Sequence, residues 1–195
     1  MRRLPWIGQL HLLLSKIHDR RGEHEAALRE ARKAVEADPF ALELRAHLSG
    51  LLILYGHADE AKKEALAHSA AFPGESWPHM QLAKLYEAEG DLPKALAAAE
   101  EARRLAPGKR SLAEHYGLLL LKNGRLAACE DLGRQALAKD ASQGWAWRLL
   151  CRCAEARVDK AAALEYGKKA LAAHPEEADF QRYYARMLQK ADGRA

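Results

Sequence analysis

A fixed step of 34 residues constrains this chain more than any other feature of its sequence. Glycine and proline recur at that step, as Gly22, Gly56, Gly90 and Gly124 and, with one gap, as Pro39, Pro73, Pro107 and Pro175. Small residues keep the same step, as Ala27, Ala61, Ala95, Cys129 and Ala163. This combination is typical of stacked helical hairpins, in which each hairpin buries its apolar face against its neighbours. The sequence therefore predicts an all-α array rather than a globular core.

The repeat divides the chain into five units, each holding helix A, a turn at the glycine and helix B. We expect an N-terminal lead-in over 1–7, units over 8–41, 42–75, 76–109, 110–143 and 144–177, a capping helix over 178–190 and a polar tail over 191–195. Amphipathic spacing predicts a buried stripe in the first helix A of Leu10, Leu13, Leu14 and Ile17, and in helix B of Ala27, Leu28, Ala31, Ala34 and Val35. The last helix carries an apolar face of Phe180, Tyr184, Met187 and Leu188, as a terminal cap requires.

The units resemble the tetratricopeptide repeat, a hairpin of 34 residues with small residues where its two helices cross. The small residue of helix A is Ser15, Ser49, Ala83, Gly117 or Cys151. The family's tryptophan occurs only once, as Trp147, the helix B aromatic is alanine or glycine, and Val158 replaces the fifth turn glycine. The resemblance covers residues 8–190. It implies a right-handed superhelical solenoid of five helix-turn-helix units plus the C-terminal capping helix.

The charge balance gives little support for nucleic-acid binding. The chain has 31 basic and 27 acidic residues, a net charge of +4. A mild excess of this kind is no electrostatic footprint for phosphate. In addition, Glu87, Glu114 and Glu155 interrupt the basic residues of the A helices and would repel phosphate. We therefore expect no nucleic-acid partner.

The N-terminus begins like a signal peptide but does not continue as one. Pro5, Gln9 and His11 interrupt the apolar run, and no small-residue cleavage site follows. No stretch approaches the ~18 apolar residues of a membrane span. Three cysteines form no evident disulfide framework. We expect a cytoplasmic protein, or a periplasmic one if an export signal has been removed.

Motifs that carry catalysis are missing from the sequence. It contains no glycine-rich phosphate loop, no Gly-x-Ser-x-Gly elbow and no His-Glu-x-x-His pair. The nine histidines are scattered. Cys151 and Cys153 are too close for a zinc pair, whose ligands need two or more residues between them. We therefore expect no enzyme activity, no metal and no cofactor.

The family resemblance implies that residues of the A helices line the concave face of the superhelix. There we expect a groove with an apolar middle and a cationic C-terminal end. The predicted partner-binding residues are Lys16, Trp77, Met80, Lys84, Trp145, Arg148, Arg152, Arg182 and Arg186. Tryptophan, methionine and arginine are favoured at interfaces, and arginine can grip a carboxylate with two hydrogen bonds. In the alternative interpretation, the tryptophans pack between units and the arginines pair with Glu155 and Asp179.

We expect a non-catalytic scaffold or adaptor that binds a protein or peptide, with an acidic or aromatic segment in its groove. The carboxylate clamp of chaperone-binding tetratricopeptide domains is absent, because Leu12 and Lys16 stand where the first unit needs lysine and asparagine, and no other starting unit restores it. Two alternatives stay open. One is self-association, in which Leu4, Trp6 and Ile7 enter a neighbouring copy. The other is a segment of a larger bacterial machine for secretion or polysaccharide export.

Overall fold

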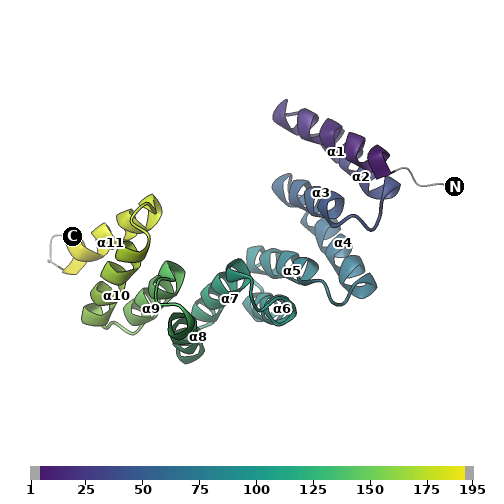
Figure 1. Ribbon diagram of the computed structural model, residues 1–195. Helices are drawn as coiled ribbons and strands as arrows, with labels where there is room; N and C mark the ends of the chain where they lie inside the picture. The colour runs from purple at the N-terminus through teal and green to yellow at the C-terminus, as the bar shows by residue number, and fades with distance from the viewer. Residues whose placement is uncertain (1–4, 192–195) are drawn as a thin grey trace. The chain divides into compact units, whose positions relative to one another are not determined.

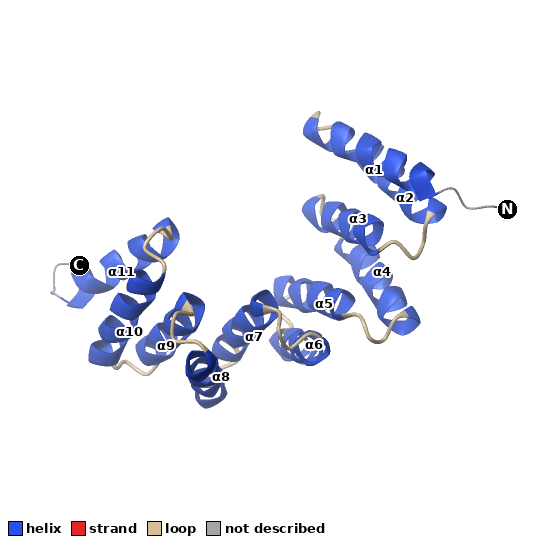
Figure 2. Ribbon diagram, in the orientation of Figure 1, coloured by secondary structure: helices blue, strands red, loops and turns tan. Residues whose placement is uncertain are grey.

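The computed structural model of the chain describes residues 5–191. These residues form eleven α-helices, α1 to α11, joined by short turns (Figure 1). Figure 2 shows helices and loops but no strand in the described residues. The predicted all-α architecture of helical hairpins is therefore confirmed. The chain divides into two compact units at the turn of the third predicted repeat.

The first compact unit, Met1–Glu89, holds five helices in its described part, residues 5–89. They are α1 (Pro5–Arg20), α2 (His24–Ala37), α3 (Leu42–Leu54), α4 (Ala58–Ala71) and α5 (Ser76–Ala88). Each helix packs against the next, and α1 also contacts α3. The core lies mainly between α2, α3 and α4, where Leu28, Leu48, Leu52 and Ala61 are buried together.

The second compact unit, Gly90–Ala195, holds six helices in its described part. They are α6 (Leu92–Leu105), α7 (Arg110–Lys122), α8 (Leu126–Lys139), α9 (Gly144–Ala156), α10 (Lys160–Ala173) and α11 (Ala178–Ala191). Phe180 and Met187 of α11 are buried against Cys151 and Ala163 of the last hairpin. Exposed charged residues lie on its other side, so α11 caps the last hairpin as predicted, except that Leu188, expected on the buried face, is 41% exposed.

Paired helices approach each other at two small residues. In the first hairpin, the Ser15 hydroxyl of α1 donates a hydrogen bond to the carbonyl oxygen of Ala27 of α2, at 2.8 Å. In the hairpin of α7 and α8, the Cys129 thiol donates to the carbonyl oxygen of Gly117, at 3.4 Å. All four residues are buried. A larger side chain at either position would push the helix axes apart.

The start of α1 differs from the sequence prediction. The helix begins at Pro5, so Trp6 and Ile7 form its first turn and do not belong to an extended lead-in. Leu4, which the self-association hypothesis also used, lies outside the described residues. At the other end, α11 reaches Ala191, and the remaining tail residues, 192–195, lie outside the described residues as well.

The buried face of α1 also differs from the prediction. Leu10, Leu13 and Ile17 are 47%, 58% and 45% exposed, although their spacing predicted a buried stripe. Leu14 is half-buried, and Leu12 is the residue that packs inward, at 1% exposure. The physical reason is position in the array. No helix precedes α1 in the described residues, so nothing there covers the face that an internal repeat would bury.

The turns within the hairpins use a left-handed residue. Gly22, Gly56, Gly90 and Gly124 have φ of 73°, 83°, 80° and 70°, and Val158 takes the same place in the last hairpin with φ of 62°. The Val158 amide donates to the Glu155 carbonyl at 2.9 Å, which closes the turn as in the glycine hairpins. A β-branched residue is strained in this conformation. Because Val158 is 77% exposed, packing does little to offset the strain.

We predict that Val158→Gly stabilises the protein. Removing the strain is worth about 1 kcal/mol, which corresponds to a rise in Tm of about 2–4 °C for a chain of this size. The matched control is Gly124→Val, where an added Cβ would meet nothing within 4 Å. Since only the backbone conformation opposes valine there, its Tm should fall by a similar amount. Thermal unfolding followed by circular dichroism measures both, and a lower Tm for Val158→Gly would contradict the strain argument.

Candidate protein-binding surface at the C-terminal end

Arg148 of α9 joins three elements of the second compact unit. Its guanidinium donates to the Glu114 carboxylate of α7 at 2.5 Å, and it also pairs with Glu177, the residue before α11. The Arg148 side chain is only 15% exposed. Both partners differ from the acidic residues that the alternative interpretation named. This arginine therefore holds helices together, and its charge is already balanced within the chain.

The other three predicted arginines divide into two kinds. Arg182 pairs with Asp179 one turn earlier on α11, as the alternative interpretation expected. The Arg152 guanidinium lies over the ring of Tyr183, 5.4 Å from its centroid. Arg186 is exposed on α11. Among the described residues, neither Arg152 nor Arg186 has a carboxylate partner. These two cations are thus the ones that remain available to a ligand.

Tyr183 also fixes the neighbouring carboxylate. Its hydroxyl donates to Glu155, at the end of α9. Burial is the main cause that raises the pKa of Tyr183, and the hydrogen bond to Glu155 adds to it. The phenol therefore stays protonated at neutral pH and continues to donate. Glu155 and Arg152 are held one turn apart by the same ring, which gives this part of α9 a defined arrangement.

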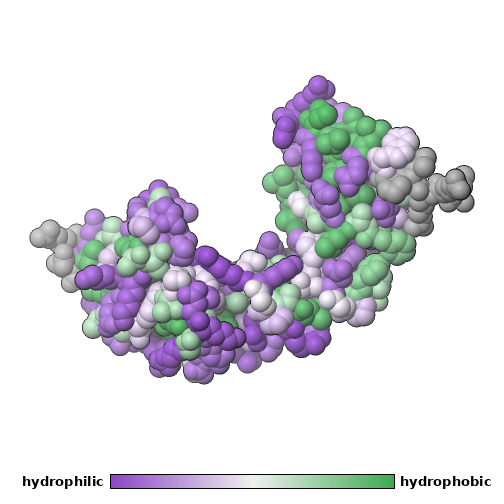
Figure 3. Space-filling view, in the orientation of Figure 1, coloured by the Kyte–Doolittle hydropathy of each residue, from purple (hydrophilic) through white to green (hydrophobic). Residues whose placement is uncertain are grey.

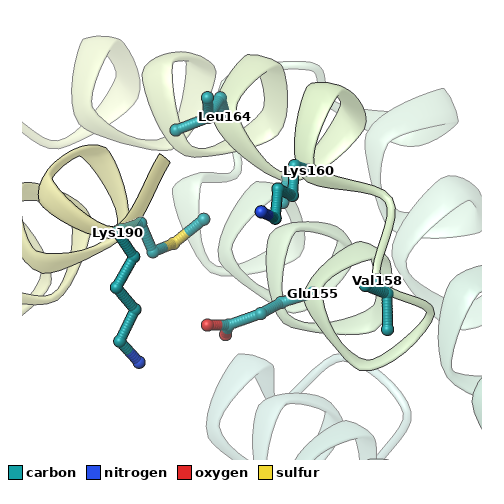
Figure 4. A pocket seen from close by; sticks show the side chains of 7 residues that line it. Glu155, Val158, Lys160, Leu164 and Lys190 are labelled. Carbon is teal, nitrogen blue, oxygen red and sulfur yellow. The ribbon is translucent and has the colours of Figure 1, made fainter. Parts of the chain in front are cut away.

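A pocket of about 270 Å³ opens next to Glu155, between the α9–α10 turn, α10 and α11 (Figure 4). Its wall is apolar and is made by Val158, Ala163, Leu164 and Met187. Its rim carries Glu155, Lys160 and Lys190. Figure 4 shows the Glu155 carboxylate and the Lys160 ammonium group directed toward the same space. With an apolar wall and charged groups only at its rim, the pocket offers a binding surface for an apolar group.

Trp145, expected to line the groove, is buried at 3% exposure. Its indole Nε1 donates to the Gln143 side chain at 2.6 Å. The ring forms part of the wall of a small cavity of about 50 Å³, beside Leu118 and Arg148. At this position the alternative interpretation describes the geometry, because the tryptophan packs inside the second unit instead of presenting its face to a ligand.

The other four predicted binding residues lie in the first compact unit. Lys16 of α1 is 3.7 Å from the Glu43 carboxylate of α3. Trp77 and Met80 of α5 are both half-buried, and Lys84 is exposed. The nine predicted residues thus form two separate sets, one in each compact unit, and their role in binding stays a prediction.

Trp77 is held by a buried histidine. The His68 ring of α4 meets the Trp77 ring edge to face, with centroids 5.6 Å apart, and the Phe72 ring at 4.8 Å. His68 is 3% exposed, and neither ring nitrogen has a hydrogen-bond partner among the described residues. Burial, followed by the nearby positive charge of Arg45, lowers the pKa of His68. The neutral imidazole therefore supports Trp77 as an aromatic packing partner.

We predict that acid weakens the first compact unit through His68. The unfolded chain protonates this imidazole near pH 6.5, whereas the folded state resists protonation until lower pH. Stability from this residue is therefore complete above pH 7 and falls as the pH drops through 6.5, by at most about 1.4 kcal/mol per pH unit. Urea unfolding at pH 7.5 and 5.5 measures how much the free energy of unfolding falls between the two pH values. This fall should be smaller for His68→Leu than for the wild type. In the control His57→Gln, which changes an exposed histidine, the free energy of unfolding should fall as much as in the wild type. If it falls just as much in His68→Leu, the pH dependence does not come from His68.

Two buried thiols lie close together outside this surface. The Sγ atoms of Cys129 and Cys153 are 2.8 Å apart, and both residues are fully buried. The contact with Cys153, with burial next, raises the pKa of Cys129. No pattern in the sequence indicated this pair, because its members come from different helices, 24 residues apart. Enclosed cysteines of this kind act as small apolar packing groups.

Neither a metal cluster nor a membrane span occurs in the described part of the chain. No group of three histidine, cysteine, aspartate or glutamate side chains there could hold a metal ion. Over the same residues, no helix combines the length and the apolar composition that crossing a bilayer demands.

Sequence reasoning missed several residues of the C-terminal surface. Lys190 lies one turn after Arg186 on the same side of α11, so extending that side of the helix by one turn would have found it. Val158 lies in the turn and Lys160 at the start of a B helix. The sequence search for binding residues considered only the A helices, so it could not find them. Tyr183 was overlooked because the pattern places it between groove positions.

No protein-family model matches this sequence, and no curated protein is similar to it. Solved structures do match its fold. A thermophilic TPR protein from Thermus thermophilus has a TM-score of 0.68 and 23% identity over 93% of this chain and 98% of that one. A tetratricopeptide repeat protein from Parabacteroides merdae has a TM-score of 0.78 and 14% identity over 97% and 75%. YrrB, described as a TPR protein with an unusual peptide-binding site, has a TM-score of 0.65 and 17% identity over 89% of each chain.

These likenesses agree with the repeat found in the sequence. The step of 34 residues, the turn glycine and the small residues at the helix crossings are those expected of tetratricopeptide hairpins. The solved structures share the arrangement over most of the chain. The chain therefore has the tetratricopeptide-repeat fold.

Proposed function

We propose that this chain is a non-catalytic interaction module that binds an acidic segment of a partner protein on its α9–α11 surface. We define that surface by Arg152, Tyr183, Arg186 and Lys190, together with the adjoining apolar pocket. The observation that carries the proposal is Arg152, whose guanidinium is stacked on Tyr183 and lacks a carboxylate partner among the described residues. A cation that is held in place and forms no ion pair can receive a carboxylate from a ligand.

The arginines of this region have two different roles in the proposal. Arg148 forms ion pairs with Glu114 and Glu177, and Arg182 forms one with Asp179, so both arginines have a structural role. Arg152 and Arg186 bind the ligand. A hydrogen bond to a charged group contributes about 1.5–3 kcal/mol. Two such contacts are enough to make the difference between a specific complex and no detectable binding.

The pocket adds a requirement for the ligand. Its apolar wall accommodates one large aliphatic or aromatic side chain, while Lys160 and Lys190 at the rim attract carboxylates on either side of it. Glu155 is the one acidic residue of the lining, and Tyr183 already donates to it. The ligand we propose is therefore an acidic segment that carries one large apolar residue. That YrrB, a protein of the same fold, is described as having a peptide-binding site supports this kind of use.

The residues of the first compact unit extend the proposal. Trp77 is half-buried, so part of its ring remains accessible, and Lys84 is exposed on the same helix, α5. Met80, half-buried, lies on the same helix, and Lys16 lies on α1. We propose that this set binds an aromatic or mixed segment of a partner.

We predict that Arg152→Ala/Arg186→Ala abolishes capture of the partner. The experiment is a pull-down from source lysate with the immobilised wild type and variant, with bound proteins identified by mass spectrometry. The partner's binding segment is then measured as a synthetic peptide by calorimetry. Loss of two charge-assisted contacts should weaken that binding by at least about 100-fold, and the helical circular dichroism signal should stay unchanged.

The matched control removes the same charge elsewhere. Arg104→Ala/Arg134→Ala changes two arginines of the B helices α6 and α8, each paired with a glutamate of its own helix. This control should bind like the wild type. Equal binding by the control and the Arg152/Arg186 variant would exclude the α9–α11 surface as the binding site.

A further inference from the structure

An uncovered apolar stripe runs along α1. Trp6, Leu10, Leu13 and Ile17 are 61%, 47%, 58% and 45% exposed. Their spacing of four, three and four residues places them on one face of the helix. That face is opposite to the one that carries Leu12 into the core. Figure 3 shows apolar residues gathered along α1 at the surface of the first unit. A run of exposed large apolar side chains on one helix face, rather than single scattered ones, marks a candidate interaction site.

The first and the last of the described helices differ in the polarity of their outer sides. The outer side of α11 carries exposed Arg182, Arg186 and Lys190, as expected for a terminal helix of a repeat array. The outer side of α1 has no comparable polar cover. The polar outer side of α11 does not match the stripe, so stacking copies head to tail would leave apolar groups against charges.

We propose that the α1 stripe is a dimer interface between two copies of this chain. The argument is the symmetry of its spacing. When two α1 helices pack antiparallel about a two-fold axis, Leu10 lies opposite Leu13 of the second copy and Trp6 lies opposite Ile17. Every large side chain of the stripe then meets an apolar partner at the same level, and no residue of the stripe is left over. A stripe with unequal outer spacings would not match itself in this way.

The edges of the stripe agree with this pairing. Gln9, Lys16 and Arg20 flank it on one side. In the antiparallel register, the Lys16 side chains of the two copies are displaced by about 13 Å along the helix axes, so like charges do not face each other. The opposite edge is apolar, with Ile7 and half-buried Leu14. An interface made by the same patch on both copies closes at two chains and does not extend into a filament.

The dimer has a consequence for binding that does not depend on which ligand is bound. Two joined copies carry two of every surface that one copy has. A partner with repeated binding segments would then gain by binding both copies at once. The dimer proposal itself stands on α1 alone and is tested without any partner.

The first test is the mass of the full chain in solution. Sedimentation equilibrium over about 1–200 μM, which covers dissociation constants in the micromolar range, should show a monomer–dimer equilibrium. Leu10→Glu/Leu13→Glu should shift it to monomer, with a dissociation constant at least about 100-fold weaker. The substitutions lie on an exposed face, so circular dichroism and Tm should report an intact fold. The matched control is Leu66→Glu, a leucine of α4 that is also 47% exposed, and it should dimerise like the wild type.

A second test determines how the two α1 helices are aligned in the dimer. The native cysteines are buried, so new surface thiols are the reactive ones. With oxidised glutathione, a mixture of Leu10→Cys and Leu13→Cys chains should form disulfide-linked pairs between the two variants. Trp6→Cys alone should not, because antiparallel packing separates its two copies by about 16 Å along the axis.

Four outcomes would overturn the proposal. A monomer throughout the concentration range would show that a second copy does not cover the stripe. Dimers that persist in Leu10→Glu/Leu13→Glu would place the interface elsewhere. Rapid cross-linking of Trp6→Cys to itself would show parallel packing, and growth beyond two chains would favour a head-to-tail contact.

Discussion

Contacts between small, buried residues set the distance between paired helices, and the rest of the structure depends on that distance. The Ser15 hydroxyl reaches the Ala27 carbonyl, and the Cys129 thiol reaches the Gly117 carbonyl, only because neither crossing point carries a large side chain. With so little room inside a hairpin, the large apolar side chains must find partners on the next hairpin. Stability is therefore shared between neighbours, as in other repeat arrays, and each end of the array has one face with no internal partner.

The two ends show what this sharing demands. At the C-terminal end, α11 supplies Phe180 and Met187 to the last hairpin and turns its charged residues outward. At the N-terminal end, α1 packs on α2 and α3 through one face and leaves a second apolar face in water. Fully burying a side chain such as leucine is worth about 1.5–3 kcal/mol. Burying the exposed stripe of α1 would therefore contribute stabilising free energy that the single folded chain lacks.

The fold could be predicted from the sequence because its determinants are local and periodic. The turn glycine, the small crossing residues and the amphipathic spacing all act within one hairpin, and each occurs several times. The fate of individual site residues could not be predicted in the same way. Arg148 is neutralised by Glu114 and Glu177, which lie in neighbouring elements, and the burial of Trp145 depends on packing with α7. Periodicity identifies an apolar face of α1 but does not say whether a neighbour covers it.

The contrast between Arg148 and Arg152 shows how position decides what an arginine does. At 15% exposure, Arg148 has lost most of its hydration, and two carboxylates compensate for that loss. Removing either one would leave a buried charge poorly balanced, which is costly. Arg152 lies over the face of Tyr183, an interaction that orients the guanidinium yet leaves its hydrogen-bonding edge unmatched by a carboxylate in the described residues. A ligand carboxylate can therefore replace water at Arg152 without breaking an ion pair, whereas at Arg148 it would first have to displace one.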